Sequence, residues 1–265
     1  MKAVILAGGF GYRLGIDRTK NPKPLIEIGG KPLIWYIMKN YSFNGIKDFI
    51  ICTGYKHDSF IKFFSKFNKY EKKSKVIRIS KNSFLIEFKN KVNWKIKIVF
   101  TGLKTNTGGR IKKISNLIGQ KEIFCVSYAD SISDINIKEE IKFHLKKKKI
   151  ATLAAVSIPN RFGVLKIKND SVKSFLEKPT INSSKINGGY FIFSKKIMNY
   201  IKSDNTALEE YPMERLCKLN QINGFSHNGF WQTVDNMKDK KFLNSLYILK
   251  KGPWNKKNKI WKNVV

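Results

Sequence analysis

The chain has 265 residues, of which 42% are hydrophobic; this length and content are typical of one large α/β domain, and no apolar run approaches the ~20 residues of a membrane span. Its net charge of +33 comes from 46 lysines and 6 arginines spread along the chain, a bias that an AT-rich genome produces. That spread argues against a nucleic-acid-binding patch, and the N-terminal residues lack a signal-peptide cleavage site, so we expect a cytoplasmic protein without nucleic-acid or membrane partners.

The N-terminal residues predict a short buried strand that runs into a glycine-rich turn. The strand covers Lys2–Leu6, and Gly8, Gly9, Gly11 and Arg13 follow it. Glycines directly after a strand let phosphate oxygens approach backbone N–H groups. A purely structural tight turn needs one glycine and rarely three. The stretch therefore predicts a site for a phosphate compound.

Two common phosphate-binding patterns do not fit this turn. The Walker pattern, which ends in a lysine and a serine or threonine, is absent from it. The dinucleotide pattern G-x-G-x-x-G fails because Leu14 stands at its third glycine position. The next expected strand, Asp48–Thr53, also ends at Gly54 without the acidic residue that holds a ribose. A hydride-transferring enzyme is therefore disfavoured.

The rest of the chain alternates strands with helices and carries hairpins in two regions. Further strands are expected at Asp48–Thr53, Glu122–Tyr128 and Ile150–Ser157, and helices at Pro32–Asn44, 59–68, Ile137–Lys146 and Met237–Lys250. Antiparallel hairpins are expected over 74–101 and at Gly163–Lys168 with Ser171–Leu176. The pattern predicts an α/β fold with a Rossmann-like mixed, mostly parallel sheet, flanked by helices and carrying β-hairpin insertions, in a single domain over 1–265.

The cysteines, one run of lysines and two aspartates allow further predictions. The three cysteines are too few and too scattered for a disulfide framework or a zinc site, so Cys52 and Cys125 are expected to be buried in core strands. The lysines at 146–149 fall between a helix and a strand, where a solvated turn is expected. Asp130 ends a buried strand, where open α/β sheets place their sites, and Asp134 is expected to cap the helix that starts near 137.

Several motifs, in chain order, resemble those of sugar-phosphate nucleotidylyltransferases. The first is L-A-G-G-x-G-x-R-L, followed by K-P-L at Lys23–Leu25. The others are IEIGGKPLIWYIMK (26–39), GIKDFIICTGYK (45–56), TGGRIKK (107–113), NRFGVL (160–165), FLEKP (175–179), INGGYF (186–191) and GFWQTVDNMKDK (229–240). They span nearly the whole chain, and TGGR, INGG and FWQ-x-x-D are more specific than the glycine loop alone. Together they look like the members of this family that make CDP-glucose.

The resemblance implies a fold and a reaction. The fold is that of nucleotide-diphospho-sugar transferases, with a nucleotide-binding part at about 1–135 and a sugar-phosphate-binding and C-terminal part at about 136–265. The reaction is transfer of a cytidylyl group from CTP to α-D-glucose 1-phosphate, with Mg²⁺ as cofactor. The attacking phosphate is largely ionised at neutral pH because its second pKa is ~6, so no general base is required. A homo-oligomer, and use of the product for a surface polysaccharide, are implied in the same way.

The resemblance also implies the site residues. Arg13 would stabilise the departing pyrophosphate and Lys23 the α-phosphate, as catalytic residues. Asp130 and Asp235 would hold the metal. The nucleotide, with its cytosine at TGGR, would be bound by Leu6, Ala7, Gly8, Gly9, Gly11, Tyr12, Arg13, Lys23, Thr107, Gly108, Gly109, Arg110, Tyr128 and Asp130. The sugar phosphate would lie near Arg161, Gly163, Glu177, Lys178, Asn187, Gly188 and Trp231.

Two departures from the family pattern bear on specificity. Tyr12 stands where the family usually has threonine, and Ala129 and Ser131 flank Asp130 where the family commonly has glycines. Both departures leave the base and the sugar open. The alternatives are the same chemistry with another nucleotide or sugar 1-phosphate, a non-catalytic sugar-nucleotide sensor, and a basic nucleic-acid-binding protein.

Overall fold

The computed structural model describes residues 1–11, 21–66, 74–80, 82–88, 93–119, 123–157, 164–176 and 185–255. The strands are β1 (Lys2–Ala7), β2 (Glu27–Ile28), β3 (Lys31–Pro32), β4 (Asp48–Thr53), β5 (Ser74–Ser80), β6 (Ser83–Phe88), β7 (Lys95–Phe100), β8 (Ile123–Tyr128), β9 (Ser131–Ser133), β10 (Ala151–Val156), β11 (Val164–Lys168), β12 (Ser171–Leu176), β13 (Ile186–Ser194), β14 (Ile222–His227) and β15 (Trp231–Thr233). The α-helices are α1 (Leu33–Phe43), α2 (His57–Ser65), α3 (Thr107–Lys113), α4 (Ile137–Lys147), α5 (Tyr211–Lys218) and α6 (Met237–Ile248), and the 3-10 helices are η2 (Lys23–Leu25), η4 (Ser115–Leu117), η5 (Lys195–Tyr200) and η6 (Pro253–Asn255).

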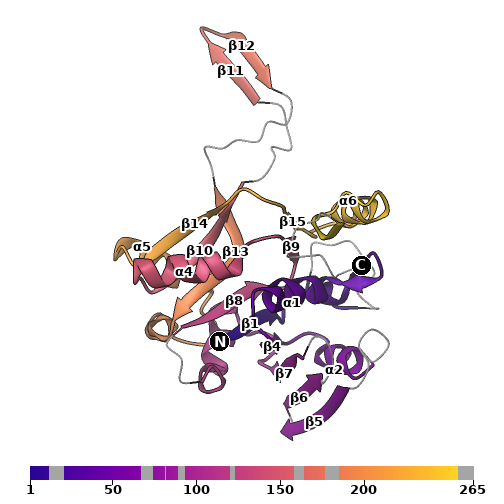
Figure 1. The fold of residues 1–265 in the computed structure, drawn as a ribbon. Helices are drawn as coiled ribbons and strands as arrows, with labels where there is room; N and C mark the ends of the chain where they lie inside the picture. Colours follow the sequence, from indigo (N-terminus) through magenta and orange to yellow (C-terminus); the bar gives the residue numbers. More distant parts are fainter. Residues whose placement is uncertain are drawn as a thin grey trace.

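A nine-stranded sheet in the order β14-β10-β13-β8-β1-β4-β7-β6-β5 forms the centre of the molecule (Figure 1). Its middle strands β8, β1, β4 and β7 are parallel. On one side β13 runs antiparallel to both β8 and β10, and on the other β6 runs antiparallel to β7 and β5. The mixed sheet expected from the sequence is confirmed, with parallel pairs in the centre and also between β10 and the edge strand β14.

The central strand β1 is buried on both faces, which explains the unbroken apolar run from Ala3 to Ala7 that follows Lys2. Ala3 and Ile5 belong to one hydrophobic cluster and Val4 and Leu6 to the other. Helices α1 and α2 cover the first face, and α3 and α5 the second. The carboxyl end of β1 is thereby held rigidly between two layers of helices.

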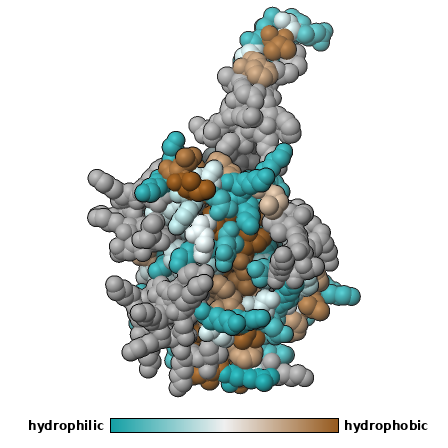
Figure 2. Space-filling model, turned by 90° about the vertical axis from the view of Figure 1, so that its right-hand side faces the viewer, coloured by the Kyte–Doolittle hydropathy of each residue, from teal (hydrophilic) through white to brown (hydrophobic). Residues whose placement is uncertain are grey.

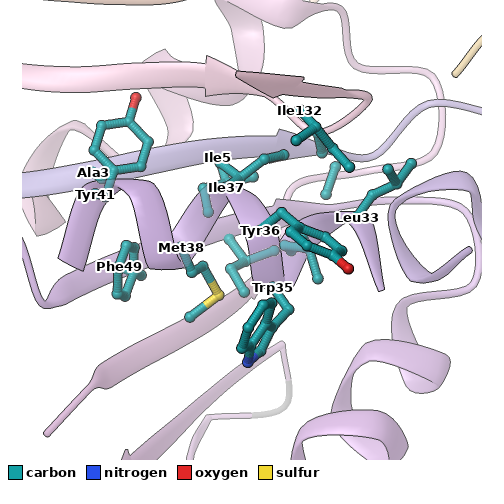
Figure 3. Close-up of a cluster of buried hydrophobic side chains, with 14 of the residues drawn as sticks. Ala3, Ile5, Leu33, Trp35, Tyr36, Ile37, Met38, Tyr41, Phe49 and Ile132 are labelled. Carbon is teal, nitrogen blue, oxygen red and sulfur yellow. The ribbon is translucent and has the colours of Figure 1, made fainter. Parts of the chain in front are cut away.

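Helix α1 supplies much of the first cluster because its apolar residues recur at helical spacing. In Figure 3, Ile37 and Tyr41 of this helix lie against Ala3 and Ile5 of β1. Ile37 is 1% exposed and Tyr41 is fully buried. Burying a side chain such as Ile37 contributes roughly 1.5–3 kcal/mol, so this contact fixes the helix on the sheet.

Two short ladders and a hairpin lie outside the main sheet. β9 pairs with β15 so that Ser131 faces Thr233 and Ser133 faces Trp231. β2 pairs with β3, and β11 with β12. In Figure 1 the β11–β12 hairpin stands away from the body, and Figure 2 shows both hydrophobic and hydrophilic side chains at its tip. Among the described residues, no helix has the length and apolar character needed to cross a membrane.

Most of the expected elements are confirmed. β4 has the expected bounds, α1 is shorter by one residue at each end, and α6 ends two residues early. The antiparallel strands over 74–101 and the hairpin across the turn at 169–170 are present. Cys52 and Cys125 are buried as expected, whereas Cys217 is exposed.

One expectation is wrong. Asn136 caps α4, because its side-chain oxygen accepts a hydrogen bond from the backbone N–H of Glu139 at 3.1 Å. Asp134 instead accepts the backbone N–H of Phe230 at 2.6 Å and lies 3.1 Å from Nε2 of His227. A contact distant in sequence therefore takes the side chain that local spacing assigns to the helix.

Candidate active site

A cavity of about 400 Å³ lies at the carboxyl ends of β1 and β8, where open α/β sheets place their ligands. Four segments and one side chain from the C-terminal part form its wall. They contribute Leu6, Ala7, Gly8, Gly9, Gly11, Lys23, Pro24, Thr105, Asn106, Thr107, Arg110, Tyr128, Ala129, Asp130 and Asp235. The cavity brings together most of the predicted nucleotide and metal residues that the structure describes.

The glycine turn after β1 is shaped by what lies beneath it. A Cβ added to Gly8 would fall 2.1 Å from Nη1 of Arg110, so no larger residue fits without moving that guanidinium. Gly11 has a φ of +67°, which L-residues other than glycine rarely adopt. The turn therefore needs its glycines for close packing and for backbone conformation, in addition to any approach of a phosphate.

Arg110 of α3 ties together the ends of three parallel strands. Its guanidinium donates to the carbonyls of Gly8, Thr53 and Gly102, each at 2.9 Å, and to Oγ1 of Thr101 at 2.7 Å. The side chain is 4% exposed, and burial lowers the pKa of the guanidinium.

The charge on Arg110 has no ion-pair partner among the described residues. Arginine nevertheless stays protonated in proteins, so a positive charge is fixed under the glycine turn. Such a charge attracts phosphate toward the turn. Arg110 thus holds the strand ends together and supplies positive charge under the turn. Its contact with a cytosine stays a prediction.

Lys23 lies between two carboxylates and beside the glycine turn, since a Cβ added to Gly11 would lie 3.6 Å from Cβ of Lys23. Its Nζ is 3.0 Å from Oδ2 of Asp130 and 2.8 Å from Oδ1 of Asp235. The lysine begins the 3-10 turn η2, next to Pro22 and Pro24, which restrict the backbone there. Its side chain is only 15% exposed.

The β9–β15 ladder brings the two aspartates together. Asp130 directly precedes β9, and Asp235 lies two residues after the end of β15. The backbone N–H of Val234 donates to the carbonyl of Asp130 at 2.9 Å. Oγ1 of Thr233 donates to Oδ2 of Asp235 at 2.8 Å. This bond orients the carboxylate oxygen that does not contact Lys23.

This pair of carboxylates fits a hard divalent cation. Both side chains are about one-third exposed, at 37% and 34%, so a hydrated ion can reach them. No group of three or more His, Cys, Asp or Glu side chains gathers elsewhere in the described part of the chain to hold a metal. Mg²⁺ typically takes one or two carboxylates and completes its shell with phosphate oxygens and water.

The TGGR segment forms the other end of the cavity in a different way from that expected. Thr107 and Arg110 line the cavity, but Gly108 and Gly109 do not. A Cβ on Gly109 would lie 2.3 Å from the carbonyl oxygen of Asp204, and one on Gly108 would lie 2.8 Å from that of Thr206. These glycines allow the segment before α5 to pack closely on α3, and their contact with a base stays a prediction.

Part of the predicted sugar-phosphate site is described. Trp231 donates from Nε1 to the carbonyl of Gly188 at 2.8 Å, which joins β15 to β13. Asn187 is exposed, and its Oδ1 accepts the backbone N–H of Gly189 at 2.9 Å. A Cβ at Gly189 would meet the ring of Tyr128 at 2.6 Å, so this segment lies beside a residue of the cavity wall.

Some predicted residues lie outside the described residues: Tyr12, Arg13, Arg161, Gly163, Glu177 and Lys178. Conversely, Pro24, Thr105 and Asn106 line the cavity although sequence reasoning did not select them. The signal for Thr105 and Asn106 was their place shortly after β7, a strand parallel to β4 and β1. Glu209 accepts hydrogen bonds from Thr107 and Tyr128. No sequence motif pointed to this residue.

Comparisons with known proteins agree with this arrangement. The family model described as "Nucleotidyl transferase" matches residues 2–234. A glucose-1-phosphate cytidylyltransferase of Salmonella typhimurium is 41% identical over 255 residues, which are 96% of this chain and 98% of that protein. A mannose-1-phosphate guanyltransferase of Aspergillus oryzae is 29% identical over 90% of this chain and 62% of its own. The crystal structure of HddC from Yersinia pseudotuberculosis has a TM-score of 0.67 at 25% identity and covers 93% of this chain and 99% of its own. The chain belongs to the nucleotidyl transferase family.

Proposed function

We propose that this protein transfers the cytidylyl group of CTP to α-D-glucose 1-phosphate and releases CDP-glucose and pyrophosphate. The observation that carries the proposal is the group of Lys23, Asp130 and Asp235, which lies beside the glycine turn in one cavity. A reaction between two polyanions needs cationic groups at the phosphates and carboxylates for a metal. The Salmonella relative, which is named for this activity, supports the choice of CTP and glucose 1-phosphate.

The proposed reaction is an in-line displacement at the α-phosphorus of CTP. A phosphate oxygen of the sugar phosphate forms the new P–O bond, and the bond to the bridging oxygen of pyrophosphate breaks. Pyrophosphate leaves with that electron pair. Because the attacking phosphate is largely ionised above its second pKa of ~6, no side chain has to remove a proton. The task of the protein is to align the two substrates and to offset their charge.

Each end of the triphosphate has a cationic group in this proposal. The N–H groups of Gly9 and Gly11 face the phosphates, with the fixed charge of Arg110 beneath them. Lys23 exchanges one of its carboxylate partners for the α-phosphate and stabilises the charge that develops there. Arg13, which lies outside the described residues, stabilises the departing pyrophosphate.

Asp130 and Asp235 would hold the divalent cation, which we propose to be Mg²⁺. When bound, the cation supplies positive charge that offsets the phosphate oxygens. Thr233 keeps one carboxylate of the pair oriented. The base would lie toward Thr107 and the sugar phosphate toward Asn187, Gly188 and Trp231, with the remaining predicted sugar-site residues outside the described part.

Pyrophosphate release tests this proposal. The purified protein is incubated with each of the four NTPs, glucose 1-phosphate and Mg²⁺, and CTP is expected to give the highest kcat/KM. Asp130→Asn and Lys23→Ala should each reduce kcat by about 10²–10³, as the loss of a charge-stabilising group does. Equal release with all four NTPs would refute the cytidylyl assignment, and near-normal rates in both variants would refute these roles.

A second candidate keeps the chemistry but changes the nucleotide or the sugar 1-phosphate. The relation to a mannose-1-phosphate guanyltransferase favours it, and the same assay over several sugar phosphates decides between the two. A non-catalytic sensor would bind CTP without turnover. A nucleic-acid-binding protein would bind duplexes with an affinity that falls steeply with salt.

We also propose that the protein works in the cytoplasm as a homo-oligomer and that its product feeds the synthesis of a surface polysaccharide. Light scattering after gel filtration tests the first point. A mass near 30.7 kDa would refute the oligomer. Loss of the polysaccharide on deletion of the gene tests the second.

A further inference from the structure

Glu209 joins the two sides of the base end of the cavity without lining the cavity itself. It lies in the segment before α5, and its two carboxylate oxygens accept from two hydroxyls. Oε2 accepts from Oγ1 of Thr107 at 2.6 Å, at the start of α3, and Oε1 accepts from Oη of Tyr128, at the end of β8. These partners are 102 and 81 residues away in sequence, and both line the cavity.

The hydroxyls of Thr107 and Tyr128 each donate their proton to Glu209, so neither can donate it to a ligand. A serine, threonine or tyrosine hydroxyl has one proton to donate and lone pairs with which to accept. Here the carboxylate takes the proton of each. An ordinary tyrosine phenol is protonated at neutral pH, so Oη of Tyr128 is the donor in its bond to Glu209. Thr107 additionally accepts the backbone N–H of Leu208 at 2.8 Å, which holds its Oγ1 in place.

We propose that Glu209 is a specificity-determining positioning residue: by fixing the protons of Thr107 and Tyr128, it makes both hydroxyls acceptors toward the nucleotide base. The inference rests on the proposed function for the position of the base. An acceptor wall favours a base edge that donates through an exocyclic amino group, as cytosine does, over one that presents a carbonyl, as uracil does. Glu209 therefore contributes to the choice of CTP over UTP through two other side chains.

The isosteric test is Glu209→Gln, which removes the charge and keeps the shape of the side chain. Glutamine has a single acceptor oxygen and an NH₂ group that donates, so it can accept from only one of the two hydroxyls. The other hydroxyl becomes free to donate to a carbonyl on the base. Glu209→Asp keeps the carboxylate and serves as the conservative variant. Glu210→Gln removes the neighbouring exposed carboxylate and is the matched control.

The primary measurement is nucleotide affinity by calorimetry, with CTP and UTP against each full-length protein. The wild type is expected to bind CTP more tightly than UTP. The ratio of the two affinities is expected to fall about tenfold in Glu209→Gln, the factor that one hydrogen bond of ~1.4 kcal/mol supplies. Glu209→Asp should restore part of the ratio, and Glu210→Gln should keep it. The affinity for glucose 1-phosphate is expected to be unchanged, which separates this role from a general loss of structure.

Three outcomes would overturn the inference: equal affinity of the wild type for CTP and UTP, an unchanged ratio in Glu209→Gln, or an equal loss of the ratio in Glu210→Gln. Turnover is measured separately as pyrophosphate release from both nucleotides. A protein that discriminates CTP from UTP in binding but releases no pyrophosphate would refute the proposed reaction and leave the role of Glu209 standing. The two failures are therefore distinguishable.

Discussion

A buried carboxyl group on α4 makes a quantitative prediction about stability. Glu140 is fully buried, and neither of its carboxylate oxygens has a hydrogen-bond partner among the described residues. Burial raises the pKa of this carboxyl from 4.5 to about 8. The ionisable side chains coupled to it are Tyr41, Cys125 and Tyr190, whose own pKa values are raised mainly by burial. Glu140 is therefore neutral in the folded protein at pH 7.

The sign of the pH dependence follows from proton binding. Between pH 4.5 and about pH 8 the folded protein keeps the proton of Glu140 and the unfolded chain loses it, so the free energy of unfolding falls as pH rises. The slope is about 1.4 kcal/mol per pH unit, and over the whole interval it amounts to roughly 5 kcal/mol. This is an upper bound, because any water that reaches the carboxylate lowers the cost of its charge.

The substitution that tests this pH dependence is Glu140→Gln, which keeps the shape of the side chain and removes its ionisable proton. The free energy of unfolding is measured by urea denaturation, followed by tryptophan fluorescence, at pH 5, 6, 7 and 8. The stability of the variant relative to wild type should increase steadily with pH, by up to about 4 kcal/mol across this range. Glu139→Gln on the same helix removes an exposed carboxylate and its ion pair with Lys142, and its difference from wild type should not follow this trend. A difference between Glu140→Gln and wild type that does not change with pH would refute the reasoning.

Three further predictions concern the cavity. Gly8→Ala should raise the Kd for CTP by about tenfold or more, because its Cβ would displace the Arg110 guanidinium; calorimetry measures this, and unchanged affinity would contradict the packing argument. Lys23→Gln should tighten binding of Mg²⁺ to the nucleotide-free protein by about tenfold, since the carboxylates lose their internal cation; metal titration decides, and weaker binding would argue against a shared site. Asp134→Ala should lower the free energy of unfolding by about 1–3 kcal/mol, because the N–H of Phe230 loses its acceptor; an unchanged urea midpoint would show that the turn does not need it.

The sequence predicts the elements whose environment is local. β1 and β4 carry unbroken apolar runs, Ala3–Ala7 and Phe49–Cys52, because both faces of these strands are covered. α1 shows a helical repeat of apolar residues because one of its faces is covered. The position of β13 between β8 and β10 could not be predicted, because it depends on a pairing that no local pattern encodes. The expected strand, helix and next strand are present as β8, α4 and β10. However, β13 lies between β8 and β10 in the sheet and runs antiparallel to both.

In the site, too, the sequence predicts which residues take part, but not the contacts between distant segments. The cavity contains Lys23, Asp130 and Asp235, which the motifs singled out. The same motifs do not reveal that Gly109 packs on Asp204 or that Arg110 holds three strand ends, because these contacts come from distant parts of the chain. Asp134 illustrates the error most plainly: its spacing suits a helix cap, and its partner is 96 residues away.

The ladder between β9 and β15 has a consequence for the order in which the protein is completed during synthesis. Lys23 is separated from Asp130 by 107 residues and from Asp235 by 212. The parallel strands β1, β4, β7 and β8 leave the ribosome long before β15 does. Closing so large a loop costs entropy that is recovered only when β15 pairs. A growing chain can therefore assemble the glycine turn and Arg110 early, but it carries no complete pair of carboxylates until nearly all of it has been made.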